Sequence, residues 1–274
     1  LKGKTPRRGP PKVDSSMVTY TPLPQSVHER YQEVTLCVDI MYVNTIPFLL
    51  TISRKIKFGT IEALDGQTAS KLFKAIQNVA RVYHNGGFRV RHVLMDGQFE
   101  CLRGPLLGIQ ALLNTTSRDE HVGDIERYVR TTKDRMRCTY TTTPFTVMCH
   151  RMVIELAMRS VFWLNAFPAT DGISSTLSPR TIVTGQTVHH DRHCTYDFGQ
   201  YVQTHEEHDN TMAPRTVGAL AMRPTGNVQG SFYFLSLDTG RIINRLHATP
   251  LPMPNEVIDR VRRMARQQKA NNGL

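Results

Sequence analysis

Residues 34–53, VTLCVDIMYVNTIPFLLTIS, decide how the rest of the chain is interpreted. They form the longest apolar run in the sequence and contain one acid, Asp39. Segments 34–38 and 46–53 are both apolar and of strand length, so two neighbouring strands are expected. A carboxylate in such a run is costly to desolvate unless it lies at the open end of its strand or binds a cation. Asp39 is therefore the first candidate functional residue.

The composition bounds the class of protein. The chain has 274 residues, a net charge of +11 and a pI of about 9.7, which favours a polyanionic partner such as nucleic acid. Five cysteines without a Cys-x-x-Cys pair argue against a disulfide framework and suit a reducing compartment. We find no membrane-spanning run and no signal peptide, and expect a piece of a longer polypeptide because the first residue is not Met.

The order of the next elements places a second acid near the first. We expect a third strand at 55–64, a helix at 68–84 and a fourth strand at 88–95, which ends at Asp96. A helix between strands implies a parallel return onto the same sheet, so the first and fourth strands can lie side by side. Asp39 and Asp96 would then meet at one edge of the sheet.

A third acid comes from a later helix. A short helix at 105–113 and a short fifth strand at 112–116 precede a basic helix at 122–138 and a longer apolar helix at 145–167. Glu126 opens the basic helix, with Asp124 and Glu120 as alternatives. Three carboxylates suit two divalent cations that activate the attacking oxygen and stabilise the leaving oxygen of a phosphodiester displacement.

The basic helix also carries cations. Glu126, Arg130 and Lys133 stand at i, i+4 and i+7 and share one face. This face is suited to a DNA strand entering the site, and the competing interpretation is an intrahelical Glu–Arg pair on a solvated helix.

The remaining segments are less informative. After a Gly/Ser/Thr/Pro-rich connector at 168–192, short strands at 198–203, 216–223, 231–237 and 241–246 predict a small all-β module, and 256–269 a basic helix. Residues 1–27 form a basic arm that is either a plain linker or a nucleic-acid contact. The histidines at 189, 190, 193, 205 and 208, with Cys194, do not have the spacing of a closed zinc site.

Three blocks resemble those of a known family. Residues 35–53 with Asp39, residues 94–100 with Asp96, and residues 123–137 with Glu126 resemble, in order, the catalytic blocks of copia-type retrotransposon integrases. Residues 178–185 and 230–243 resemble motifs that follow that core, and residues 1–4 resemble the segment after the family's zinc finger, which would lie upstream. The 29 residues between Asp96 and Glu126 are fewer than is usual in the family, and Asn-Gly does not precede the Glu.

The resemblance implies a fold and an activity. The expected fold is α/β, with an RNase H-like mixed five-stranded sheet flanked by helices, a small all-β, SH3-like module and a basic C-terminal helix. The expected division is a basic arm at 1–27, a catalytic core at 28–168, a linker at 169–194, a β-module at 195–252 and a helical tail at 253–274. The implied activity is integrase-type 3′-end processing and strand transfer of DNA, and the alternative is a degraded or domesticated integrase fold that binds nucleic acid.

The resemblance also assigns residues and partners. Asp39, Asp96 and Glu126 are the implied catalytic residues and the ligands of two Mg²⁺ or Mn²⁺ ions, with no other cofactor. The implied DNA-binding residues are Arg127, Arg130, Lys133 and Arg137. The implied partners are double-stranded DNA, as element ends and target, and further copies of the chain, without a membrane. The expected location is the nucleus, preceded by a virus-like particle or the cytoplasm.

Overall fold

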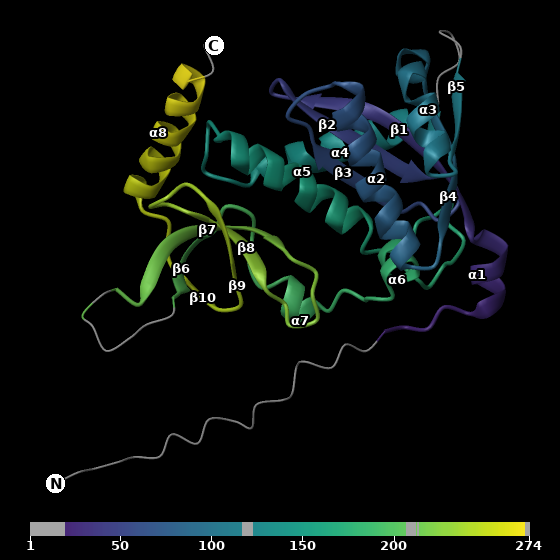
Figure 1. Ribbon diagram of the computed structural model, residues 1–274. Helices are drawn as coiled ribbons and strands as arrows, with labels where there is room; N and C mark the ends of the chain where they lie inside the picture. The colour runs from purple at the N-terminus through teal and green to yellow at the C-terminus, as the bar shows by residue number, and fades with distance from the viewer. Residues whose placement is uncertain (1–19, 117–122, 207–211, 213, 272–274) are drawn as a thin grey trace.

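The computed structural model describes residues 20–116, 123–206, 212 and 214–271. Within them the chain forms two five-stranded sheets, and one helix, α5 (His150–Leu164), contacts both (Figure 1). A helix not expected from the sequence, α1 (Gln25–Tyr31), begins inside the predicted basic arm at 1–27, most of which lies outside the described residues. No described helix is long and apolar enough to cross a membrane.

The first three strands form an antiparallel meander. β1 (Glu33–Val43) pairs with β2 (Ile46–Ser53), and β2 pairs with β3 (Gly59–Ala63). The bounds of β2 are those predicted, whereas β1 continues for several residues past Asp39. Asn44 and Thr45 join β1 to β2 with positive φ angles of 47° and 68°, the conformation that suits the twist of a two-residue hairpin.

A helix returns the chain to the other side of β1. α2 (Ala69–Asn85) begins after Thr68, whose hydroxyl accepts a hydrogen bond from the Lys71 backbone N–H at 3.4 Å. The chain then forms β4 (Arg89–Asp96), which runs parallel to β1. The 3₁₀ helix η1 (Gly97–Leu102) follows β4, and the helix expected at 105–113 is the shorter and earlier α3 (Arg103–Gly108).

The strand β5 (Leu112–Thr116) pairs in parallel with β4 and completes the first sheet. The strand order is β3-β2-β1-β4-β5, with an antiparallel meander and two parallel strands. This confirms the predicted mixed five-stranded sheet of the RNase H-like type, flanked by helices (Figure 1).

The two faces of β1 pack against different helices. Leu36 and Val38 belong to the cluster that contains α2, whereas Cys37 and Met41 belong to the cluster that contains α4 (Gly123–Thr141) and α5. Side chains alternate along a strand, so Asp39 lies on the same face as Cys37 and Met41. The position of Asp39 in the strand therefore directs its carboxylate toward the face that α4 covers.

The helix α5 is shorter than the predicted 145–167 and is fixed to β3 at its end. The carbonyl oxygen of the Asn165 side chain accepts from the Gly59 N–H at 2.8 Å, and the Asn165 amide donates to the Gly59 carbonyl at 2.7 Å. Asn165 follows the last residue of α5 and is buried. These two bonds satisfy backbone groups that would otherwise be buried without partners.

The second half of the chain contains an antiparallel sheet, which confirms the all-β character expected there. The predicted connector forms two short helices, α6 (Pro179–Thr184) and α7 (His190–His193). The sheet order is β10-β6-β7-β8-β9, and the strands are β6 (Tyr201–His205), β7 (Thr216–Pro224), β8 (Phe232–Ser236), β9 (Ile242–Arg245) and β10 (Ala248–Pro250). Its SH3-like character stays a prediction.

The second sheet packs on α5 through apolar and charged contacts. Leu220 and Met222 of β7 belong to the same buried cluster as Leu156 of α5. Glu155 of α5 forms an ion pair with Arg223 of β7 at 2.7 Å, and both side chains are largely buried. The core is thus continuous across the predicted linker, although the division into domains stays a prediction.

The C-terminal helix α8 (Asn255–Asn271) uses the apolar side that its sequence pattern indicates. Val257, Val261 and Met264 are buried in the same cluster as α5 and β7. The helix therefore packs on the body of the protein through at least two of its turns.

Candidate functional site

Asp39 and Asp96 come from neighbouring parallel strands in matched register. The last paired residues of β1 and β4 are Cys37 and Leu94, so two residues further the same register places Asp39 opposite Asp96. Asp96 ends β4 and lies at the N-cap position of η1, where the chain turns away from the sheet. Asp39 is half-buried and Asp96 is exposed, which leaves this sheet edge accessible.

The helix α4 brings Glu126 and Lys133 to the same place. Both residues act electrostatically on the Asp39 carboxylate, together with Asp96. Burial raises the pKa of Asp39 above its ordinary value, and the charges of Asp96 and Glu126 raise it further. The Ile40 N–H, which donates to Asp39 Oδ1 at 2.7 Å, and the Lys133 ammonium act in the opposite direction. The structure thus brings the three predicted carboxylates and one predicted cation into one electrostatic neighbourhood.

The donors at this site have the chemistry that a hard divalent cation prefers. Asp39 and Asp96 offer carboxylate oxygens, and the raised pKa of Asp39 shows that its charge is not fully compensated. However, within the described residues no three His, Cys, Asp or Glu side chains lie close enough together to hold a metal ion. Glu126 also takes part in a polar interaction of its own. The acids are therefore electrostatic neighbours that do not form a ready-made three-ligand cage.

Asp124 and Glu120 are the two alternatives to Glu126 as the third acid of the site. Asp124 forms ion pairs with Arg54 Nε at 3.4 Å and Lys57 Nζ at 3.2 Å. Burial raises the pKa of Cys37 to about 11, and the next largest contribution comes from the charge of Asp124. Asp124 thus lies beside Cys37 and is already paired, which favours Glu126. Glu120 lies outside the described residues.

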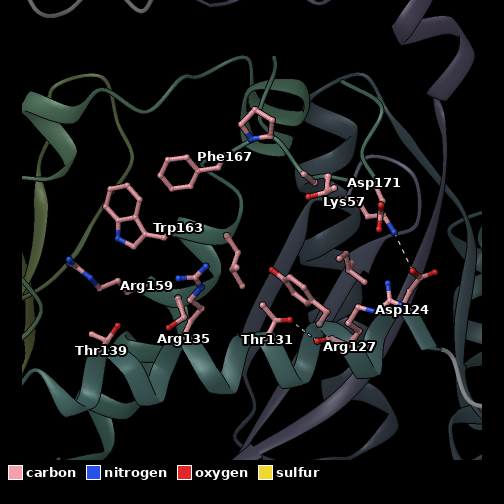
Figure 2. Close-up of a pocket in the computed structure, with 17 residues that line it drawn as sticks. Lys57, Asp124, Arg127, Thr131, Arg135, Thr139, Arg159, Trp163, Phe167 and Asp171 are labelled. Atoms are coloured by element: carbon pink, nitrogen blue, oxygen red, sulfur yellow. Dashed lines mark hydrogen bonds and ion pairs between the residues drawn. The ribbon is translucent and has the colours of Figure 1, made fainter. Parts of the chain in front are cut away.

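The four predicted DNA-binding residues of α4 do not form one surface. Lys133 lies near Asp39, whereas Arg127 lines a cleft on the other flank of the helix (Figure 2). Arg130 is exposed, and Arg137 pairs with Asp134 at 2.6 Å. Arg127 and Lys133 therefore lie on different flanks of α4, and the face expected for Glu126, Arg130 and Lys133 stays a prediction.

A groove that the sequence did not predict begins at Lys133 on α4. It has a volume of about 900 Å³ and lies among the β1–β2 hairpin, α4, the segment before α5 and α8. Its lining includes the basic residues Lys133, Arg137 and His150 and the exposed rings of Tyr42 and Tyr140, and no acid among the described residues. The aromatic residues were missed because they come from separate elements and share no sequence pattern.

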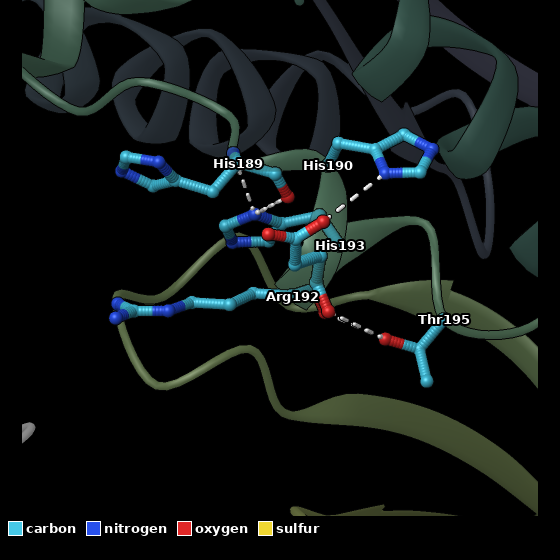
Figure 3. Close-up of polar contacts among 6 residues, drawn as sticks. His189, His190, Arg192, His193 and Thr195 are labelled. Carbon is cyan, nitrogen blue, oxygen red and sulfur yellow. Dashed lines mark hydrogen bonds and ion pairs between the residues drawn. The ribbon is translucent and has the colours of Figure 1, made fainter. Parts of the chain in front are cut away.

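The histidines near α7 make contacts that hold this short helix in place. The Nδ1 atom of His193 accepts from the His189 backbone N–H at 3.0 Å (Figure 3). The Nε2 atom donates to the Asn227 carbonyl at 2.9 Å. The His193 ring is buried, so both of its nitrogens serve to fix α7 against the turn before β8. His190 and Asp191 are exposed, and His208 lies outside the described residues.

No protein-family model matches the chain, and no curated protein matches it significantly. Among solved structures, the catalytic core domain of BIV integrase matches with a TM-score of 0.40 and 16% identity, over 54% of this chain and 92% of that one. The HTLV-2 integrase catalytic core domain in complex with magnesium matches with a TM-score of 0.42 and 10% identity, over 56% of this chain and 96% of that one. The fold assignment rests on the strand order described above.

Proposed function

We propose that the chain is the catalytic and C-terminal part of an integrase of the copia retrotransposon type. It would process the 3′ ends of element DNA with water and then use the 3′-hydroxyl to attack target DNA. The observation that carries the proposal is the convergence of Asp96, Glu126 and Lys133 on Asp39. Asp39 lies within β1 in register with Asp96 at the end of β4, and Glu126 lies in the first turn of α4.

Asp39, Asp96 and Glu126 would hold two Mg²⁺ or Mn²⁺ ions. Such ions, when bound, activate an attacking oxygen and stabilise a leaving oxygen. The raised pKa of Asp39 supports this assignment, because a cation would offset the burial and repulsion that raise it. Since the donors do not form a ready-made cage, we expect the Glu126 carboxylate to move toward the aspartates when a cation binds.

Lys133 would position DNA at the carboxylates. Its ammonium lies near Asp39, where it can contact a phosphate next to the scissile bond. The groove beyond Lys133 has basic and aromatic linings and could accept the continuing strand of element DNA. Arg130 and Arg137 would add phosphate contacts along the exposed surface of α4, so binding should weaken as salt increases.

Assembly and location follow from the proposed family. We propose that several copies of the chain act together on double-stranded element ends and target DNA. The work would take place in the nucleus, after passage through a virus-like particle or the cytoplasm. No membrane is part of this proposal.

The proposed activity can be tested with a labelled duplex that carries an element end. We expect Mg²⁺- or Mn²⁺-dependent nicking and strand transfer by the purified chain, and loss of both with Asp96→Asn. The matched control is Asp134→Asn, because Asp134 is an exposed acid on α4 that pairs only with Arg137 among the described residues. Equal activity of the Asp96→Asn and wild-type proteins would contradict the proposal.

A second candidate is a degraded or domesticated integrase fold that binds nucleic acid without catalysis. The absence of a three-ligand cage among the described residues favours it. Under this alternative, duplex DNA binds with the same affinity with and without Mg²⁺, and no nicking occurs in either metal. Binding together with metal-dependent nicking would exclude it.

A further inference from the structure

A second cleft lies on the flank of α4 that faces away from Lys133. It has a volume of about 650 Å³ and is bounded by α4, α5 and the segment that follows α5. Figure 2 shows Arg127, Thr131 and Arg135 along α4, with Trp163 and Phe167 across the cleft from them. None of the three proposed catalytic carboxylates lines this cleft.

The cleft has an excess of positive charge. Its lining includes the cationic residues Lys57, Arg127, Arg135 and Arg159, against the carboxylates Asp124 and Asp171. Asp124 is already paired with Arg54 and Lys57. Among the described residues, no acid forms an ion pair with Arg127 or Arg135. Two exposed guanidinium groups are therefore available to an anion.

A third guanidinium adds positive charge within the body of the protein. Arg159 donates to the Met222 carbonyl at 2.9 Å and the Tyr196 carbonyl at 3.3 Å, which orients the group without neutralising it. Burial lowers the pKa of Arg159, but arginine stays charged at neutral pH. The buried guanidinium of Arg159 thus contributes positive potential to the cleft from a fixed position.

The wall opposite α4 is aromatic. Phe167 has 65% of its surface exposed, and Trp163 is half-buried with its ring held edge-on against Phe162 at a centroid distance of 5.1 Å. Exposed aromatic faces beside free guanidinium groups are the combination that binds single-stranded nucleic acid, with bases on the rings and phosphates on the cations. A duplex offers its phosphates but keeps its base faces stacked inside.

The spacing along α4 matches an extended backbone. Arg127 and Arg135 are eight residues apart on one flank, which is about 12 Å along a helix. The two groups can therefore contact different phosphates of one strand. Thr131 lies between them, and its hydroxyl donates to the Arg127 carbonyl at 2.9 Å, so it leaves the guanidinium groups free.

We propose that this cleft binds a single-stranded polynucleotide, with unstacked bases on Trp163 and Phe167 and backbone phosphates on Arg127 and Arg135. The site is separate from the carboxylates and does not need metal chemistry. It assigns Arg127 and Lys133, which belong to the same helix, to two different nucleic-acid contacts. A base and phosphate of either DNA or RNA would fit this chemistry.

The chain offers a reporter inside the cleft, because Trp163 is its only tryptophan. A base that stacks on this ring quenches its fluorescence, so titration with oligothymidylate and with oligouridylate of about twelve nucleotides measures binding at this place. We expect saturable quenching by at least one of the two strands, and the stronger one identifies the preferred polymer. A duplex of equal length should quench weakly.

Charge variants test the phosphate contacts. The double variant Arg127→Gln/Arg135→Gln should bind the strand more weakly and reduce the slope of log affinity against log salt by about 1.4, or about 0.7 for each contact. The control Arg81→Gln/Arg89→Gln removes the same charge from exposed residues of α2 and β4 and should leave the slope unchanged. Phe167→Ala should lower the affinity at least about fivefold.

The inference can fail independently of the proposed function. Asp96→Asn should abolish nicking and leave the quenching intact. The inference is overturned if no single strand quenches Trp163, if a duplex quenches it equally, or if the two double variants behave alike. Nicking by a chain that shows no quenching would retain the integrase proposal and reject the second site.

Discussion

Asp39 on β1 lies in register with Asp96 on β4, two residues beyond the last pair of the parallel ladder, and the two carboxylates repel each other. β4 ends at Asp96, so this repulsion occurs where the sheet opens to solvent. A protein that only needed a stable sheet would gain from a neutral residue at either position. We infer that the two acids lower the stability of the fold at this edge of the sheet and serve to bind a ligand there.

The first prediction concerns Asp39 and stability. The folded state raises the pKa of Asp39, so stability decreases as pH rises from about 3.9, the ordinary value, through the raised value. Above that window the charged carboxylate destabilises the fold. Asp39→Asn should therefore be more resistant to urea than the wild type at pH 7 without divalent cations, and the difference should shrink as pH falls toward 4. A variant that is less stable than the wild type at pH 7 would contradict this account.

The second prediction concerns cations and stability. A cation that binds ionised Asp39 and Asp96 competes with protons, so its affinity should rise with pH through the raised pKa of Asp39. At a Mg²⁺ concentration one hundred times its Kd, the wild type should gain about 2.7 kcal/mol of stability. Thermal unfolding with Mg²⁺ measures this gain. Asp96→Asn should show little of it, and the same shift in both proteins would place the cation elsewhere.

Much of the first sheet follows from the sequence alone. The apolar run at 46–53 has the bounds of β2, and Asp39 and Asp96 meet because β1 and β4 are parallel neighbours in matched register, although β1 continues to Val43. The short-range patterns of alternation and helix capping are enough to predict these strands and the helix between them.

Other features depend on contacts that no local pattern records. The division of the basic residues of α4 follows from its buried stripe at Ile125, Tyr128, Thr132 and Met136, which places Arg127 and Lys133 on opposite flanks. The pairing of Asp124 depends on Lys57, a residue far away in the sequence. β10 was missed because it has three residues and ends in proline.

The third prediction concerns the ion pair that joins α5 to the second sheet. Glu155 and Arg223 are largely buried, and their closest atoms lack the geometry of a hydrogen bond although they are 2.7 Å apart. Glu155→Ala leaves Arg223 buried without its partner, so it should destabilise the protein by about 3 kcal/mol or more in urea unfolding.

The hydrophobic double variant Glu155→Leu/Arg223→Met provides the comparison for that pair. It removes both buried charges at similar volume and should be close to the wild type in stability. If the double variant loses as much stability as Glu155→Ala, the attraction between the charges, and not the cost of one unpaired charge, dominates.

The fourth prediction concerns Tyr128. Its hydroxyl is buried without a hydrogen-bond partner among the described residues, next to Gly59, where a Cβ would collide with the ring. Tyr128→Phe removes an unsatisfied polar group and should raise the free energy of unfolding by about 1 kcal/mol, measured in urea. A clear loss of stability would show that the hydroxyl has a partner.

The identity of the metal ligands tests the central claim most directly. Titration of the chain with Mn²⁺, followed by electron paramagnetic resonance of the free ion, measures cation binding without any requirement for DNA. We predict that Asp39→Asn, Asp96→Asn and Glu126→Gln each lose binding, whereas Asp124→Asn keeps it, because Asp124 is paired with Arg54 and Lys57. Undiminished binding by Asp96→Asn, or loss in Asp124→Asn with retention in Glu126→Gln, would contradict the account.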